Sequence, residues 1–176
     1  MNNINDIVIV NYDDRQIGRA SKQEAHAKGL LHRAFSIYIV NQKNEILLQK
    51  RNIHKYHSGG LWSNTCCSHP TSDCNILEFA SERLHQEFGI TSDLEEIGQF
   101  IYRNQFDNDL TEYEYDHVLF GRVSNTDVLP DLNEIDDFSW RSMDTVENLL
   151  LKKPEIFTAW FLQSFLIFKN FMKNKL

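Results

Sequence analysis

The sequence predicts a single domain of the mixed α/β (α+β) class over residues 1–176, with mixed β-sheets flanked by helices. Its 176 residues, of which 41% are hydrophobic, are enough for one sizeable core and give no sign of a second. Runs of β-branched and aromatic residues alternate with helical patterns, and no low-complexity or Pro/Gly/Ser-rich linker interrupts them.

The first half of the chain is predicted to be rich in strands. Residues 6–11, 34–41 and 46–51 are β-branched or aromatic runs, and the polar residues 42–45 are typical of a turn, so the second and third runs should form a hairpin. Residues 62–67 resume an extended pattern after a polar loop.

The second half combines one clear helix with two long strands. Residues 75–88 repeat apolar side chains at helical spacing, and Gly89 is a natural C-terminal stop. Residues 94–106 and 112–123 predict two strands joined by a polar turn. A last helix is predicted over 154–170, because proline suits a first helical turn.

The charge of the chain restricts its partners. A formal net charge of −7 argues against nucleic-acid and membrane-surface binding, which use positive fields, so we expect a small-molecule ligand. The protein is expected to be a monomer or weak dimer. An anionic ligand would need local basic residues, for which the candidates are Lys22, Arg51, Lys55 and Arg83.

The N-terminal residues lack the basic and apolar regions of a secretory signal, so a cytoplasmic location is expected. The cysteines Cys66, Cys67 and Cys74 form an odd set with two adjacent members, which suits a reducing compartment better than a disulfide framework. The most apolar stretch, 156–168, is shorter than a membrane span.

Acidic residues alternate along the strand predicted at 112–123. Glu112, Glu114 and Asp116 should share one face, because side chains two apart in a strand point the same way. Such carboxylates repel one another unless a cation holds them. The ordinary alternative for an isolated acid pair is a solvated edge strand.

Three histidines change this balance. His26, His32 and His69 would each, taken singly, be a hydrogen-bonded structural histidine. Together with Glu112 and Glu114 they match a six-coordinate site with mixed nitrogen and oxygen ligands, for which Mn, Zn, Mg and Fe are possible occupants. Pro70 disfavours helix at His69, so this histidine should lie at a strand end.

The cysteines allow another metal site. A structural zinc site could be formed by Cys66, Cys67, Cys74 and His69. Such sites usually show paired CysXXCys spacing and a second pair, neither of which is present in this sequence. A cysteine beside a metal cluster can instead act as an acid or base, because the metal favours its thiolate.

Tyr102 and Trp160 are aromatic residues that could lie beside the predicted metal and acid/base residues. Most aromatic side chains in a domain of this kind belong to the core. Tyr102 and Trp160 could also line a cavity in which a carbocation forms, since the face of a ring attracts positive charge.

Four segments carry a family resemblance: LeuLeuHisArgAlaPheSer at 30–36, TrpSerAsnThrCysCysSerHisPro at 62–70, ArgLeuHisGlnGluPheGly at 83–89 and GluTyrGluTyrAspHis at 112–117. In this order they resemble the type I isopentenyl diphosphate isomerases, a branch of the Nudix fold. The resemblance covers almost the whole chain. It implies reversible conversion of isopentenyl diphosphate to dimethylallyl diphosphate by protonation and deprotonation.

The resemblance also implies roles for individual residues. Cys67 and Glu114 match the acid/base pair, Tyr102 matches the tyrosine that orients the acidic face, and Trp160 matches the tryptophan over the cationic carbon. The diphosphate would be held by a second metal, Mg²⁺, on Glu87, and by the four basic candidates already named. The ligands of one tightly bound divalent metal (Mn²⁺, Zn²⁺ or Mg²⁺) would be His26, His32, His69, Glu112 and Glu114.

Two other functions compete with isomerisation. A Nudix diphosphate hydrolase needs ArgGlu followed by GluGlu on one helix, whereas this chain has Glu82, Arg83, Gln86 and Glu87 in that register. A Nudix-like binding module would keep the metal ligands but would have no use for Cys67 and Trp160.

Overall fold

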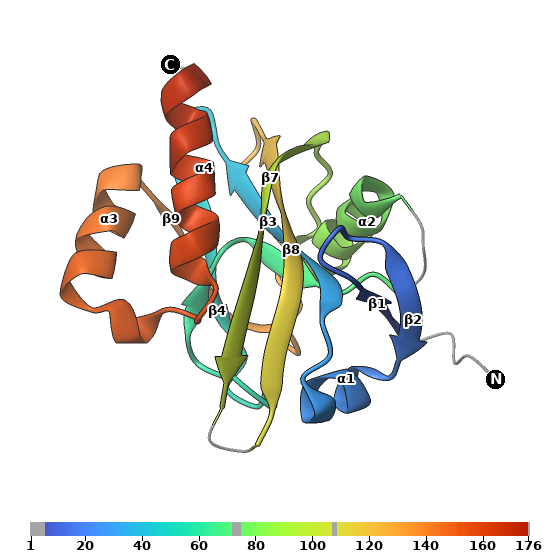
Figure 1. Cartoon of the computed structure of the whole chain (residues 1–176). Coiled ribbons are helices and arrows are strands. Elements are labelled where there is room, and N and C mark those ends of the chain that lie inside the picture. Colours follow the sequence, from blue (N-terminus) through green and yellow to red (C-terminus); the bar gives the residue numbers. More distant parts are fainter. Residues whose placement is uncertain (1–5, 72–74, 107–108, 176) are drawn as a thin grey trace.

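The computed structural model describes residues 6–71, 75–106 and 109–175, so Cys74 lies outside the described residues. Strands β3 (His32–Val40) and β8 (Thr111–Arg122) form the centre of a mixed sheet and run parallel side by side (Figure 1). β8 also pairs antiparallel with β7 (Leu94–Gln105), as predicted for 94–106 and 112–123.

The other edge of β3 meets several partners in turn. It pairs antiparallel with β1 (Ile7–Val10), then with β6 (Cys66–Ser68), and at its end with β4 (Ile46–Arg51). The predicted hairpin of the second and third strands is thus confirmed. The sheet is completed by β2 (Gln16–Ala20) beside β1, and by β5 (Trp62–Ser63) and β9 (Ile135–Arg141) beside β4.

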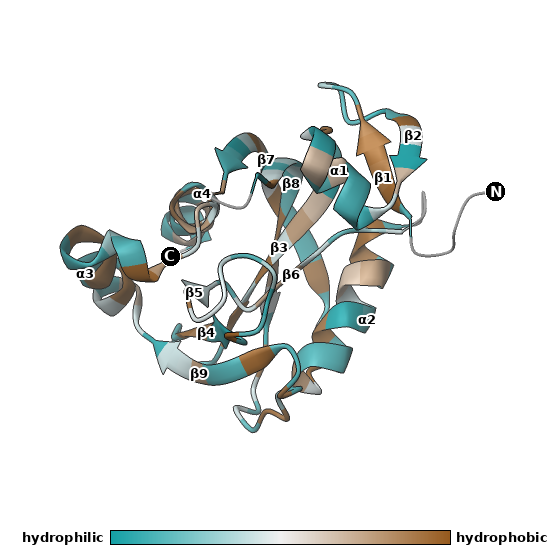
Figure 2. Ribbon diagram, turned by 90° about the horizontal axis from the view of Figure 1, so that it is seen from below, coloured by the Kyte–Doolittle hydropathy of each residue, from teal (hydrophilic) through white to brown (hydrophobic). Residues whose placement is uncertain are grey.

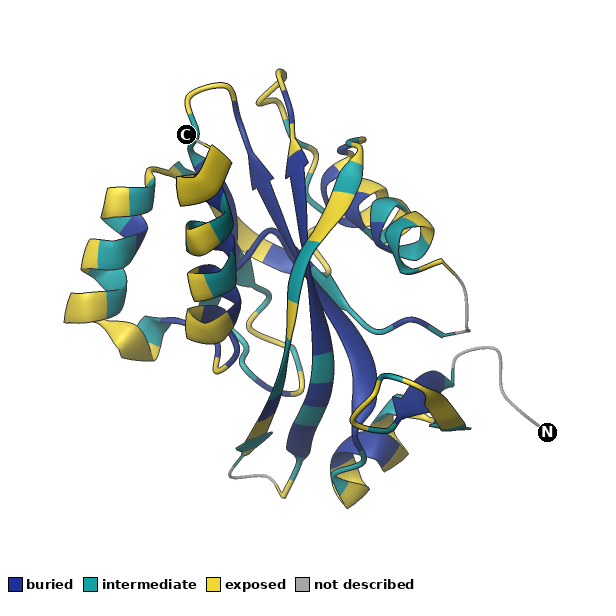
Figure 3. Ribbon diagram, turned by 45° about the horizontal axis from the view of Figure 1, so that its top comes forward, coloured by how far each residue is buried: buried dark blue, intermediate teal, exposed yellow. Residues whose placement is uncertain are grey.

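Helices cover both faces of the central strands. Helix α2 (Ile76–Phe88) lies on one face, and α4 (Phe161–Lys175) lies on the other, next to α3 (Met143–Lys152) (Figure 1). The alternation of side chains along β3 divides the core accordingly: Phe35 and Ile37 pack in the α2 layer, whereas Tyr38 packs in the α4 layer. The central strands are therefore buried over most of their length (Figure 3).

Helix α1 (Lys22–Lys28) is short and was not predicted. Its sequence, LysGlnGluAlaHisAlaLys, has too few apolar residues to show a helical period, and its ends are fixed by caps. The Ser21 side chain accepts a hydrogen bond from the Glu24 backbone N–H, and Gly29 ends the helix at φ 61°, in the left-handed region that glycine tolerates best. Gly89 ends α2 in the same way, as predicted.

Three other elements also lacked a clear sequence pattern. β2 and β9 have largely exposed or half-buried side chains, and their backbone pairing to β1 and β4 maintains them as strands. α3 carries exposed Leu151 among its apolar residues. In Figure 2, β1 is hydrophobic throughout, whereas the helices carry both hydrophilic and hydrophobic residues.

Two predicted boundaries were wrong. The strand expected at 62–67 is divided, because its first part, β5, pairs with β4, whereas its second part, β6, pairs with β3. The helix expected at 154–170 begins only at Phe161. Pro154–Ile156 form a single 3₁₀ turn, after which the backbone N–H of Thr158 donates to the carbonyl of Trp62 at 3.0 Å.

Candidate active site and metal centre

The register of the central strands brings three predicted site residues into one row. His32 at the start of β3 lies opposite Glu114 on β8, and Glu114 lies opposite Tyr102 on β7. Each backbone pairing places neighbouring side chains on the same face of the sheet. The row is therefore fixed by the hydrogen bonds of the sheet, and all three side chains are buried.

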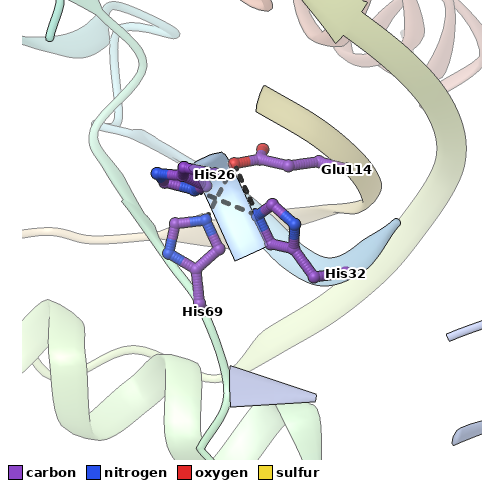
Figure 4. Close-up of side chains that lie close together, drawn as sticks. All are labelled: His26, His32, His69 and Glu114. Carbon is purple, nitrogen blue, oxygen red and sulfur yellow. Dashed lines mark hydrogen bonds and ion pairs between the residues drawn. The ribbon is translucent and has the colours of Figure 1, made fainter. Parts of the chain in front are cut away.

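Two further histidines complete a compact cluster around this row. His26 comes from α1 and His69 follows β6 directly, as its predicted place at a strand end required (Figure 4). One ligand atom from each of His26, His32, His69 and Glu114 lies within 4.8 Å of the others. His69 Nε2 is 2.8 Å from Glu114 Oε1, and the Nε2 atoms of His26 and His32 are 3.3 Å apart.

The protonation of the cluster suits a cation. Burial, together with neighbouring positive groups, lowers the pKa of His26 to about 2 and that of His69 to about 3, so both imidazoles are neutral near pH 7. His32 Nδ1 donates to the carbonyl oxygen of Leu30 at 2.8 Å, which directs its Nε2 atom toward the cluster. Three imidazoles and a carboxylate are a fitting donor set for a divalent transition metal.

Glu112 lies next to this cluster but faces different partners. Its Oε1 is 3.0 Å from His57 Nε2, and its Oε2 is 3.0 Å from the Tyr102 hydroxyl. Burial and the charge of Glu114 raise the pKa of Glu112 to about 8. For Glu114, burial opposes ionisation, but His69 and His32 hold its pKa well below the usual range.

The two carboxyl groups therefore differ in protonation at neutral pH. The Tyr102 hydroxyl lies 2.7 Å from Glu114 Oε2 as well as 3.0 Å from Glu112, yet it has one proton to donate. A proton on Glu112 resolves this, because Glu112 can donate to the tyrosine oxygen while Tyr102 donates to ionised Glu114.

Sequence reasoning missed Tyr56 and His57. Both belong to the loop between β4 and β5, and His57 is buried between Glu112 and the Phe106 ring. The Tyr56 hydroxyl lies 3.2 Å from His26 Nδ1. The available signal was an aromatic and a histidine adjacent in an otherwise polar loop.

Cys67 and Trp160, which come from other segments of the chain, line a cavity beside the histidine cluster. A cavity of about 30 Å³ is lined by side chains of the cluster together with Cys67, Trp160, Lys22 and Arg51. Burial raises the pKa of Cys67 to about 12, so the resting group is a thiol. The cavity has room for about one water molecule, so a larger ligand must displace part of its lining.

The four basic candidates fall into two groups. Arg51 lies 5.4 Å from the centre of the Trp160 ring, and Lys22 lies 5.0 Å from that of Tyr56. Lys55 and Arg83 do not line this cavity. Lys55 pairs with Glu134, while Arg83 Nη2 is 2.5 Å from Oε1 of buried Glu87.

Comparison with known proteins identifies the fold family and its branch. A NUDIX domain profile matches residues 30–161. A protein from Pectobacterium atrosepticum named isopentenyl-diphosphate Delta-isomerase is 44% identical over 92% of this chain and 90% of its own length. A protein of the same name from Burkholderia multivorans is 42% identical over 88% of each chain. The chain belongs to the isopentenyl-diphosphate Delta-isomerase family.

Solved structures similar to this isomerase-family member support the fold alone. A MutT protein from Methanosarcina mazei superposes with a TM-score of 0.66 at 23% identity, covering 83% of this chain and 96% of that one. A Deinococcus radiodurans protein gives 0.69 at 14% identity, covering 93% and 98%. The Nudix-like fold with helices on both faces of a mixed sheet is thus confirmed.

The residues expected from the isomerase resemblance are partly gathered in one place. His26, His32, His69 and Glu114 form the cluster, with Glu112 and Tyr102 in contact beside it. Cys66 is buried in the α2 core rather than beside His69, which disfavours the alternative zinc site. Within the described residues, no helix is both long and apolar enough to cross a membrane.

Proposed function

We propose that this protein interconverts isopentenyl diphosphate and dimethylallyl diphosphate. The single observation that carries the proposal is that Cys67, Glu114 and Trp160 line one cavity next to the histidine cluster. A thiol and an ionised carboxylate in one cavity provide one proton donor and one acceptor. The reaction needs both, because one carbon gains a proton and another loses one while the double bond moves between them.

Aromatic and tyrosine side chains prepare this cavity for the proposed intermediate. Protonation of the alkene leaves a tertiary carbocation, and the Trp160 ring can stabilise it through its negative face. Tyr102 donates to Glu114 at 2.7 Å and fixes the direction of that carboxylate. Burial keeps the pKa of Tyr102 well above its usual range, so it remains a donor.

A divalent metal is proposed at His26, His32, His69 and Glu114, with Glu112 joining once its proton is released. Mn²⁺, Zn²⁺ and Mg²⁺ are the candidate occupants, and the bound ion would supply positive charge that favours the carboxylate form of Glu114. Lys22 and Arg51 are proposed to bind the diphosphate at the cavity. This anion site would be extended by Lys55 and Arg83, and by a second Mg²⁺ bound to Glu87.

Hydrolysis of a diphosphate is the less suitable alternative. A Nudix hydrolase assembles Mg²⁺ from several acids on one helix. On α2, Glu82 is exposed, Gln86 is neutral and Glu87 is buried. The helix therefore offers a single buried acid, where the hydrolase register needs several.

Isopentenyl diphosphate incubated with the protein and Mg²⁺ in D₂O should give dimethylallyl diphosphate that contains deuterium, without release of phosphate. Proton NMR measures both the product and the exchange, and a phosphate assay of the same sample provides the control. Phosphate release without isomerisation would instead assign the protein to the hydrolases.

Replacement of Glu112 by Gln should lower metal affinity at pH 8 and change its pH dependence. Because the pKa of Glu112 is about 8, a metal must displace a proton from Glu112 below that pH. The metal affinity of the wild type, divided by that of the variant, should therefore fall by about tenfold for each unit by which the pH is lowered below 8. The buried His26 and His69, with pKa values of about 2 and 3, do not contribute in this range.

The measurement is competitive titration with a chelator between pH 5 and 8, at the same ionic strength for both proteins. A constant ratio of the two affinities across this range would exclude Glu112 from the ligand set, leaving three histidines and Glu114.

A further inference from the structure

Asn64 connects the two parts of the proposed reaction site that come from different segments. It lies between β5 and β6, and its side chain is fully buried. Its Oδ1 atom is 3.1 Å from Cys67 Sγ and 3.2 Å from Trp160 Nε1. One oxygen atom therefore contacts both the thiol and the indole.

The orientation of the Asn64 amide follows from its partners. The indole N–H can only donate a hydrogen bond, so the amide oxygen must face Trp160. The amide nitrogen faces the carbonyl oxygens of Ile37 at 3.2 Å and Cys66 at 2.9 Å, and these can only accept. A flipped amide would place donor against donor and acceptor against acceptor, so the arrangement has one solution.

A neighbouring hydroxyl extends this contact to the segment before α4. Ser63 Oγ donates to Asn64 Oδ1 at 3.0 Å and lies 3.1 Å from Thr158 Oγ1. Ser63 and Thr158 are both buried. The β5–β6 segment that carries Cys67 and the segment that carries Trp160 are thus joined by side chains as well as by the pairing of Trp62 with Phe157.

We propose that Asn64 is a positioning residue for isomerisation, whose carbonyl oxygen holds the Cys67 thiol and the Trp160 ring in a fixed relation across the cavity. This inference rests on the proposed roles of those two residues. A proton donor and a cation-stabilising ring must face the same few carbon atoms, and a misplacement of about 1 Å can slow a reaction roughly 100-fold.

The decisive variant is Asn64→Leu, which retains a branched side chain but has no acceptor. We expect kcat to fall roughly 10- to 100-fold with little change in KM or metal content, because diphosphate and metal contacts lie elsewhere. In ¹H–¹⁵N spectra, the indole signal that disappears in Trp160→Phe should shift upfield in Asn64→Leu, since its hydrogen bond is lost. If Asn64→Leu does not fold, Asn64→Ser, which is too short to reach either partner, is measured instead.

Two further variants separate positioning from simple structural support. Thr65→Val is the matched control, because Thr65 is equally buried and its hydroxyl joins Ile39 and Leu47 without contacting Cys67 or Trp160. It should retain kcat and the indole signal. Asn64→Asp keeps an acceptor oxygen, and burial beside two carbonyls should keep it protonated, so it should recover part of kcat.

An unchanged kcat in a folded variant without the acceptor would overturn the positioning role, as would an equal loss of kcat in Thr65→Val. Cys67→Ala, measured in the same series, keeps this failure distinct from failure of the proposed function. Fast turnover by Cys67→Ala would remove the role of Cys67 itself, whereas slow turnover by Cys67→Ala with normal Asn64→Leu would refute only the positioning by Asn64.

Discussion

Replacement of Cys67 by alanine should slow turnover of isopentenyl diphosphate at least ~100-fold, the usual scale for a positioned acid or base. Cys67 lines the cavity with Glu114, and burial keeps its pKa at about 12, so the thiol is the form available to transfer a proton. Alanine removes this group and little else. We expect the folded structure and the metal content of the variant to remain those of the wild type.

Cys66 provides a matched control for this substitution. It is adjacent in sequence and fully buried, but it packs in the α2 core with Leu84 and does not line the cavity. Cys66→Ala should therefore retain turnover while losing a small amount of stability. Steady-state rates and urea unfolding of both variants check the pair, and near-normal turnover by Cys67→Ala would refute the acid/base role.

Glu114→Gln should have a still larger effect, because Glu114 is proposed both to bind the metal and to transfer a proton. Turnover should fall by at least ~1000-fold, within the range for loss of a positioned acid or base combined with a weakened metal site. The amide also replaces an ionised acceptor that His69 contacts at 2.8 Å and Tyr102 at 2.7 Å. Metal analysis of purified protein should find far less than one ion per chain.

Asp116 is the control for charge and burial at this position. It lies on the same face of β8, is buried, and accepts a hydrogen bond from Ser36 at 2.8 Å. Burial and the charge of Glu114 raise the pKa of Asp116 well above its usual range, so Asp116→Asn conserves a neutral group. This variant should retain its metal. Full metal occupancy in Glu114→Gln would contradict the proposed ligand set.

The sequence predicted the centre of the sheet because its strands have strong patterns. The apolar run in β3 predicted a strand, and the acidic alternation of β8 indicated which of its side chains share a face; the buried Glu112 and Glu114 confirm that shared face. The periodicity of 75–88 likewise predicted α2 and its end at Gly89. The elements that were missed, α1 and β9 among them, depend on caps and backbone pairing, which residue patterns do not show.

The candidate site could be predicted only in part for a similar reason. Motif spacing pointed to His26, His32 and His69. It did not identify His57, because this residue joins the site only through the fold of the β4–β5 loop against Glu112. The division of the basic residues also depends on long-range contacts. Lys55 and Arg83 both approach Glu134, a residue more than fifty positions away in sequence that no local pattern connects to them.

Because β3 pairs in parallel with β8, insertions inside these strands would disturb the candidate active site more than insertions in the connections. A residue inserted inside either strand would reverse which side chains face the cavity, so Tyr113 or Tyr115 would replace Glu114 opposite His32. A residue inserted between β7 and β8 would leave both strands in register with their partners, provided that the connection accommodates the added residue without shifting either strand. Variation in length among functional relatives should therefore be confined to the connections, while the strands keep a constant number of residues between His32 and the end of β3.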